Sequence, residues 1–188
     1  MKHIKMLGLA VMAAAAFMAF AGSASAAPTL TSPAGTEYTG TIESTASGSL
    51  LLKAGFANIT CTASTVSGTV SSNTEAEASG AISTLTFSNC GSATVTTITK
   101  GSLTILPSGA VSGSGSEVTV GISSLGTSCI YGTKTGTALG TLVGGTPAKM
   151  TIKANLPLVK TASGFGCASP AEWSGSYTVT KPSTLLLA

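Results

Sequence analysis

Four cysteines are the residues whose type and spacing most directly predict a chemistry. Cys61, Cys90, Cys129 and Cys167 form an even set, and all lie well beyond the N-terminal segment. They include no Cys-x-x-Cys pair, and the only histidine is His3, which argues against a zinc site or a redox-active dithiol. Structural disulfides are the remaining interpretation. Four cysteines allow three pairings. We favour Cys61–Cys90 and Cys129–Cys167, because each links neighbouring segments and would staple one half of the domain.

Catalytic residue types are scarce in the rest of the chain. It contains no Asp, Arg or Gln, and no histidine follows residue 3, so a Ser-His-Asp triad cannot be assembled there. The six glutamates are the only side-chain carboxylates for a glycosidase pair. Glu172, beside Trp173, is the one we place nearest a cleft, whereas Glu75 and Glu77 share a polar loop. We therefore expect a protein that is not an enzyme.

Cofactors and nucleic acid are not expected as partners either. The sequence has no phosphate-binding or dinucleotide motif and no cluster of oxygen ligands for calcium. After residue 26, seven lysines and six glutamates leave the chain nearly neutral, and the lysines do not cluster. Binding to nucleic acid needs a patch of cationic side chains that neutralises phosphates. The sequence therefore predicts no cofactor, no metal and no nucleic acid partner.

Two aromatic residues are the candidates for lining a ligand site. Trp173 and Tyr177 are four residues apart, and alternate side chains of a strand point to the same face. On a regular strand the two rings would therefore lie together. Burial in the core is the more common role of such residues, and a bulge at Gly175 would place the rings on opposite faces. Both interpretations stay open.

The segments that carry these residues alternate between apolar and polar positions with period two. The alternation is clear over residues 65–70, 83–88, 118–122, 150–156 and 173–179. It predicts strands with one face turned inward. Turns rich in Gly and Pro separate the strands at short intervals, and no repeat of fixed length occurs. We expect about ten strands in an all-β fold, namely an antiparallel sandwich with Greek-key connections and two disulfides.

The N-terminus has the three parts of a secretory signal. Lys2 and Lys5 precede an apolar run over residues 6–20, and residues 24–26 (Ala-Ser-Ala) offer the small side chains that signal peptidase requires. The run is shorter than the roughly 20 residues of a membrane span, and no later segment is long and apolar enough for one. We expect residues 1–26 to be removed. Residues 27–188 would then form a single β-rich domain, secreted to the extracellular space, the periplasm or the cell surface.

Several short motifs resemble those of known secreted proteins. They are residues 30–36 (LTSPAGT), Cys61 followed by residues 66–70 (VSGTV), residues 85–90 (LTFSNC), residues 129–132 (CIYG) and residues 173–179 (WSGSYTV). Together they resemble small secreted bacterial proteins of no assigned activity and, more loosely, the exported protein activator of alkane oxidation of pseudomonads. This resemblance covers most of residues 27–188 and rests mainly on small residues and cysteines. It implies an accessory role outside the cell, helping cells to meet hydrophobic substrates, and it assigns no catalytic residue.

Two functions outside the cell fit these features. The first is a non-enzymatic structural or accessory protein that self-associates or forms part of the surface, because few charges leave sheet edges open to pairing. In one version of it, residues 185–188 (LLLA) are donated to a neighbouring copy as a strand. The simpler alternative, which we favour, is that this run completes the domain's own sheet. The second function is a soluble binding module for hydrophobic or glycan ligands, with its site near Trp173 or Tyr177.

Overall fold

Strands make up nearly all the regular structure of the described residues. A computed structural model describes residues 27–55 and 57–188, which form sixteen strands and one 3-10 turn, Ser123–Leu125. The all-β prediction is therefore confirmed. The predicted signal peptide, residues 1–26, lies outside the described residues. Within the described ranges, no helix is long and apolar enough to cross a membrane.

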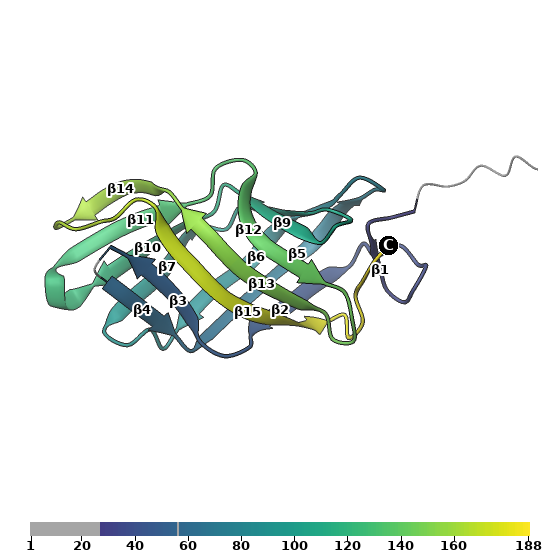
Figure 1. The fold of residues 1–188 in the computed structure, drawn as a ribbon, viewed down its shortest axis with the longest axis horizontal. Coiled ribbons are helices and arrows are strands. Elements are labelled where there is room, and N and C mark those ends of the chain that lie inside the picture. Colours follow the sequence, from purple (N-terminus) through teal and green to yellow (C-terminus); the bar gives the residue numbers. More distant parts are fainter. Residues whose placement is uncertain (1–26, 56) are drawn as a thin grey trace, which may run out of the picture.

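The largest sheet closes on itself into an eight-stranded barrel (Figure 1). Its strands are β2 (Thr41–Ala46), β5 (Ala63–Asn73), β6 (Ala78–Ser88), β8 (Ser102–Ile105), β9 (Ala110–Ser114), β12 (Thr137–Val143), β13 (Lys149–Leu156) and β15 (Ala171–Lys181). They follow one another around the barrel in the order β13-β12-β9-β8-β6-β5-β2-β15, and every pair is antiparallel. The closing pair is β13 with β15, in unbroken register from Lys149 opposite Thr178 to Leu156 opposite Ala171.

This closure corrects the sequence-based prediction of an antiparallel Greek-key sandwich. The physical cause of the closure lies in bends that alternation does not reveal. The β5–β6 pair contains two register shifts. A Cβ atom on Gly80 would lie 2.1 Å from the carbonyl oxygen of Thr69, and one on Gly68 would lie 2.6 Å from that of Ala81. Only glycine permits this close approach of two backbones. Bulges and glycines of this kind curve a sheet until its first and last strands can pair.

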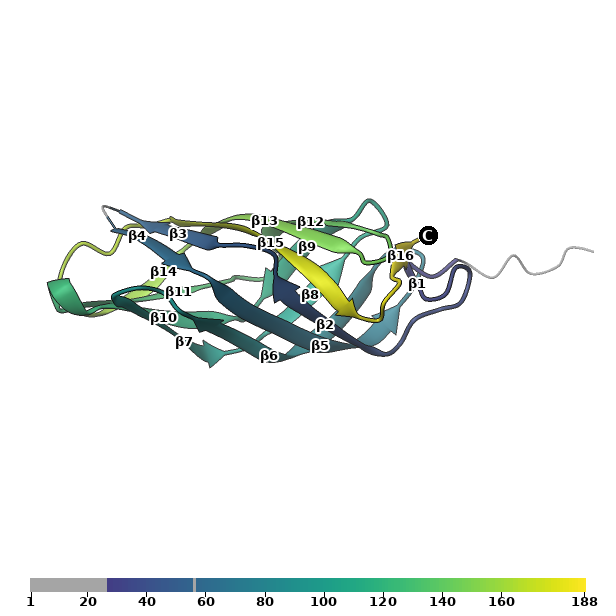
Figure 2. The same cartoon turned by 90° about the horizontal axis from the view of Figure 1, so that it is seen from below.

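A second, smaller sheet turns one end of the molecule into two layers. It has four strands in the order β14-β11-β10-β7. Their bounds are β7 (Ala93–Thr99), β10 (Glu117–Ile122), β11 (Thr127–Gly132) and β14 (Leu158–Ser163). Opposite it, β3 (Leu50–Ala54) and β4 (Ala57–Cys61) extend the barrel sheet beyond β15. Figure 2 shows the four-stranded sheet beneath β3 and β4. Two sheets therefore face each other, as in a sandwich, at this end of the barrel.

The two chain ends of the described domain pair with each other at the opposite end of the barrel. β1 (Leu30–Thr31) pairs antiparallel with β16 (Leu186–Leu187). Leu185 is completely buried, and its backbone exchanges hydrogen bonds of 2.8 and 3.1 Å with Gly145. The run over residues 185–188 therefore completes the domain's own structure, as favoured above. In the structure of the single chain, this run is thus paired with β1 and not presented to a neighbour.

Both predicted disulfides are present with the predicted pairing. Cys61–Cys90 joins the last residue of β4 to the turn after β6, and Cys129–Cys167 joins β11 to the segment that precedes β15. The first bridge closes a loop with a sequence separation of 29 residues, and the second closes one of 38 residues. Each therefore fixes a segment of the two-layered end of the molecule.

Candidate ligand-binding interior

The interior contains two adjoining apolar cavities of about 70 Å³ each. We call the first the barrel cavity, because it lies within the closed barrel near the β1–β16 pair. The second is the junction cavity, which lies where the barrel meets the four-stranded sheet. Four residues line both: Val66, Ile82, Leu103 and Met150. Together the cavities approach the roughly 150 Å³ of an engineered apolar cavity that stays dry and binds benzene.

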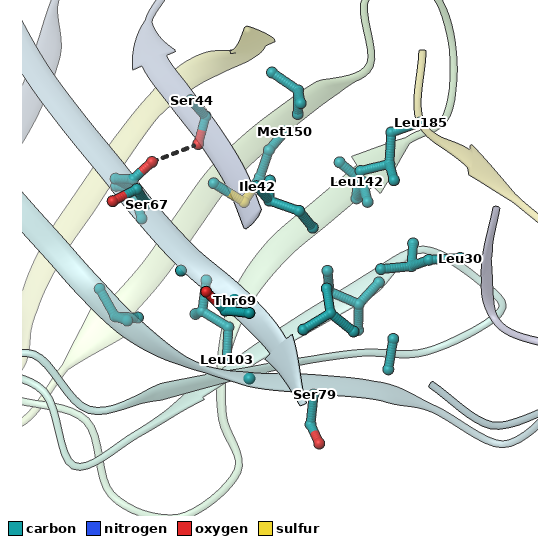
Figure 3. A pocket seen from close by; sticks show the side chains of 18 of the residues that line it. Leu30, Ile42, Ser44, Ser67, Thr69, Ser79, Leu103, Leu142, Met150 and Leu185 are labelled. Atoms are coloured by element: carbon teal, nitrogen blue, oxygen red, sulfur yellow. Dashed lines mark hydrogen bonds between the residues drawn. The ribbon is translucent and has the colours of Figure 1, made fainter. Parts of the chain in front are cut away.

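The walls of the barrel cavity are mostly aliphatic, although Ser44, Ser67, Thr69 and Ser79 also belong to its lining. Figure 3 shows Leu30, Leu142 and Leu185 with Ile42 and Met150 around it. Ser44 is the buried hydroxyl at this site, and it donates a hydrogen bond of 3.2 Å to the carbonyl oxygen of Val66. Because that buried hydroxyl is already bonded within the protein and the other three hydroxyl residues are not buried, the cavity is suited to an apolar occupant.

The junction cavity draws its walls from both sheets. Leu52, Ile59 and Trp173 come from β3, β4 and β15, whereas Val118 and Tyr131 come from β10 and β11. Three lining residues carry a hydroxyl: Ser116, Thr133 and Tyr131. Those of Ser116 and Thr133 form hydrogen bonds with the backbone. This cavity is therefore apolar as well, with one exception described next.

The exception is Tyr131, which sequence reasoning missed. Its side chain is completely buried, and its hydroxyl is the one buried side-chain nitrogen or oxygen of the described residues that has no hydrogen-bond partner. Burial raises the pKa of this hydroxyl above the ordinary value of tyrosine, so it stays protonated at neutral pH. The sequence offers one signal for its burial: Tyr131 is two residues from the disulfide-bonded Cys129 and therefore shares its face of the strand. The missing partner depends on tertiary packing, for which the sequence has no signal.

The two predicted ligand-lining aromatic residues lie on one face, as the regular-strand interpretation requires. The β13–β15 register shows no bulge at Gly175, and the rings of Trp173 and Tyr177 meet edge to face with centroids 6.4 Å apart. Trp173 also packs edge to face on Phe87 at 5.9 Å and forms part of the junction cavity. The structure thus brings both residues together, but it places only Trp173 in the wall of a cavity.

Tyr177 lies outside the lining of both cavities and serves the core. It is completely buried, and its hydroxyl forms a hydrogen bond of 2.9 Å with the hydroxyl of Ser64. Burial raises the pKa of Tyr177 to about 12, although the bond to Ser64 acts in the opposite direction. This residue therefore occupies a core position, which is the more common role of such aromatic residues.

Charged side chains stay away from both cavities. None of the described residues that line them is charged. Glu172, the glutamate placed nearest a cleft by the sequence, instead forms a solvent-exposed ion pair with Lys53 across β15 and β3, at 3.7 Å. Within the described part of the chain, no three His, Cys, Asp or Glu residues gather as metal ligands. The interior can therefore solvate an apolar molecule but offers no counter-ion to a charged one.

Comparisons with models of protein families, with curated proteins and with solved structures found no match.

Proposed function

We propose that this protein is an exported, non-enzymatic binding module that holds a small apolar molecule inside its barrel. The observation that carries the proposal is the pair of adjoining cavities, walled by aliphatic and aromatic side chains and free of charged ones in the described structure. Burial of apolar surface stabilises such a complex by about 25 cal/mol per Å² removed from water. A glycan would lose hydrogen bonds to water in these cavities without regaining them, so a hydrophobic ligand is the better match.

Export and an accessory role belong to the same proposal. The signal-like N-terminus and the two disulfides support passage into an oxidising compartment. The motifs that resemble the activator of alkane oxidation are in keeping with a protein that carries hydrophobic molecules outside the cell. Its final location would be the extracellular space, the periplasm or the cell surface.

Fluorescence of Trp173 tests the proposal directly, because Trp173 is the only tryptophan and lines the junction cavity. We expect n-hexane and toluene to change the emission of the disulfide-bonded domain, residues 27–188, in a saturable way. Leu103→Phe should weaken binding at least tenfold, because Leu103 lines both cavities and the larger ring would fill them.

Leu106→Phe is the matched control, since Leu106 is an exposed neighbour that lines neither cavity. It should bind as the unmodified protein does. Thermal unfolding of both variants shows whether Leu103→Phe is still folded. If none of the apolar probes changes the Trp173 emission of the unmodified protein, the proposal is overturned.

A self-associating structural role is the second candidate, and open sheet edges favour it. In the described structure β7 pairs only with β10, and β14 pairs only with β11. Ile98 on β7 and Val159 on β14 are each 49% exposed. Unpaired edges with exposed apolar side chains are templates for pairing with another copy.

A further inference from the structure

The Tyr131 hydroxyl, which has no hydrogen-bond partner, restricts the chemistry of a ligand that could fill the junction cavity. Buried polar groups almost always have a hydrogen-bond partner, and leaving one unpaired is unfavourable. Elsewhere in this interior the rule holds: the hydroxyls of Tyr177 and Ser64 bond each other, and that of Thr127 donates to the carbonyl oxygen of Phe165. Tyr131 departs from the rule at the wall of a cavity.

The surroundings of Tyr131 define what could bond to it. Ser116 already donates its side-chain hydrogen to the carbonyl oxygen of Lys100, and the hydroxyl of Thr133 already accepts a bond from the backbone N–H of Ser116. The Tyr131 hydroxyl is the buried hydroxyl of this lining that has no partner. A purely apolar ligand would leave it without one. A neutral oxygen on the ligand would accept the phenolic hydrogen.

The rest of the cavity restricts the charge and the shape of the ligand. A carboxylate or an ammonium group would be buried without a counter-ion, because no charged side chain lines either cavity in the described structure. Met150 lies between the two cavities, and its flexible side chain adapts easily to a neighbour. A slender hydrocarbon tail could therefore extend from the junction cavity past Met150 into the barrel cavity.

We propose that the Tyr131 hydroxyl anchors the polar end of the ligand, and that the ligand is a neutral hydrocarbon that carries a single oxygen, such as an alcohol, an aldehyde or a ketone. This inference rests on the proposed function, since it names the ligand class of the same cavities. It assigns Tyr131 the role of a specificity-determining residue, with the apolar walls supplying most of the affinity.

The test compares two probes of equal chain length, 1-hexanol and n-hexane, by titration of Trp173 fluorescence in the disulfide-bonded domain. Tyr131→Phe removes the anchoring oxygen and keeps the ring. We expect this variant to bind 1-hexanol about fivefold to tenfold more weakly, which is the effect expected for the loss of one hydrogen bond. Its affinity for n-hexane should be unchanged or higher. The change in the ratio of the two dissociation constants is the quantity measured, because the cost of dehydrating hexanol is the same in both proteins.

Tyr38→Phe is the matched control. The Tyr38 hydroxyl donates to the carbonyl oxygen of Thr41 at 2.5 Å, and Tyr38 lines neither cavity, so the ratio should not change. Hexanoate at neutral pH should bind far more weakly than 1-hexanol in every variant.

The outcomes separate this inference from the function on which it rests. If both probes bind and Tyr131→Phe leaves the ratio unchanged, a water molecule satisfies Tyr131 and the inference is overturned, while hydrophobic binding stands. If neither probe binds the unmodified protein, both are overturned.

Discussion

At the scale of single residues, the two completely buried tyrosines have opposite energetic roles. Tyr177 bonds Ser64 in the core, whereas the Tyr131 hydroxyl lacks a partner. Without ligand, Tyr177→Phe should lower the free energy of unfolding by about 1 kcal/mol, the value of one hydrogen bond. Tyr131→Phe should leave that free energy unchanged or raise it, because the substitution removes an unsatisfied polar atom.

Urea unfolding of the two variants measures the difference, with Tyr38→Phe as a third tyrosine whose hydroxyl is bonded at a less buried position. Equal losses for Tyr131→Phe and Tyr177→Phe would show that Tyr131 has a partner in solution. The comparison needs no ligand and is therefore independent of the binding experiments.

At the scale of elements, the period-two alternation predicted the strands well because it reports one local property, the face of each side chain. In β13, Met150, Ile152, Ala154 and Leu156 are buried and the residues between them are exposed, as the pattern requires. The disulfide pairing was also accessible, because it joins segments that are close in sequence and four cysteines leave few choices.

The closure of the barrel and the cavities depends on contacts that no local pattern encodes. Pairing of β13 with β15 closes the sheet, and the glycines and register shifts of the β5–β6 pair favour the curvature that brings these two strands together. Tyr131 likewise became a candidate only when packing showed its hydroxyl to be unpartnered beside a cavity. Trp173 was identified from its spacing to Tyr177, but alternation could not separate a cavity wall from the core.

The Cys129–Cys167 bridge gives a prediction at the same scale. It joins β11 to the segment before β15, with a sequence separation of 38 residues. In the chain-entropy account, a loop of this length contributes about 4 kcal/mol by restricting the unfolded chain. We expect the double substitution Cys129→Ala and Cys167→Ala to lower the free energy of unfolding by about that amount, measured by urea unfolding.

This bridge is the better one to remove, because neither cysteine lines a cavity, whereas Cys61 of the other bridge does. Apolar probes should therefore still bind the double variant under conditions where it is folded. A loss of stability well below 1 kcal/mol would contradict the entropic account of the bridge.

At the scale of the whole molecule, closure of the barrel bears on whether copies of the chain assemble. A closed sheet presents no unpaired edge around its circumference. The terminal run over residues 185–188 pairs with β1 in its own chain and is not free to join a neighbour. In the described structure the outermost strands of more than two residues are β4, β7 and β14, all at the two-layered end, whereas β1 and β16 at the other end have two residues each.

We therefore expect light scattering behind size exclusion to give the mass of a monomer for the disulfide-bonded domain, at concentrations where the ligand probes bind. A monomer with saturable binding agrees with a module that carries one apolar molecule in its interior. Larger assemblies would favour the self-associating structural role instead.

If such assemblies form, two substitutions locate the contact between copies. Ile98→Lys on β7 and Val159→Lys on β14 each place a charge on an exposed edge position, which opposes strand pairing. Dissociation by one substitution and not by the other would identify the pairing edge, and assemblies that survive both would have to form through β4 or a different surface.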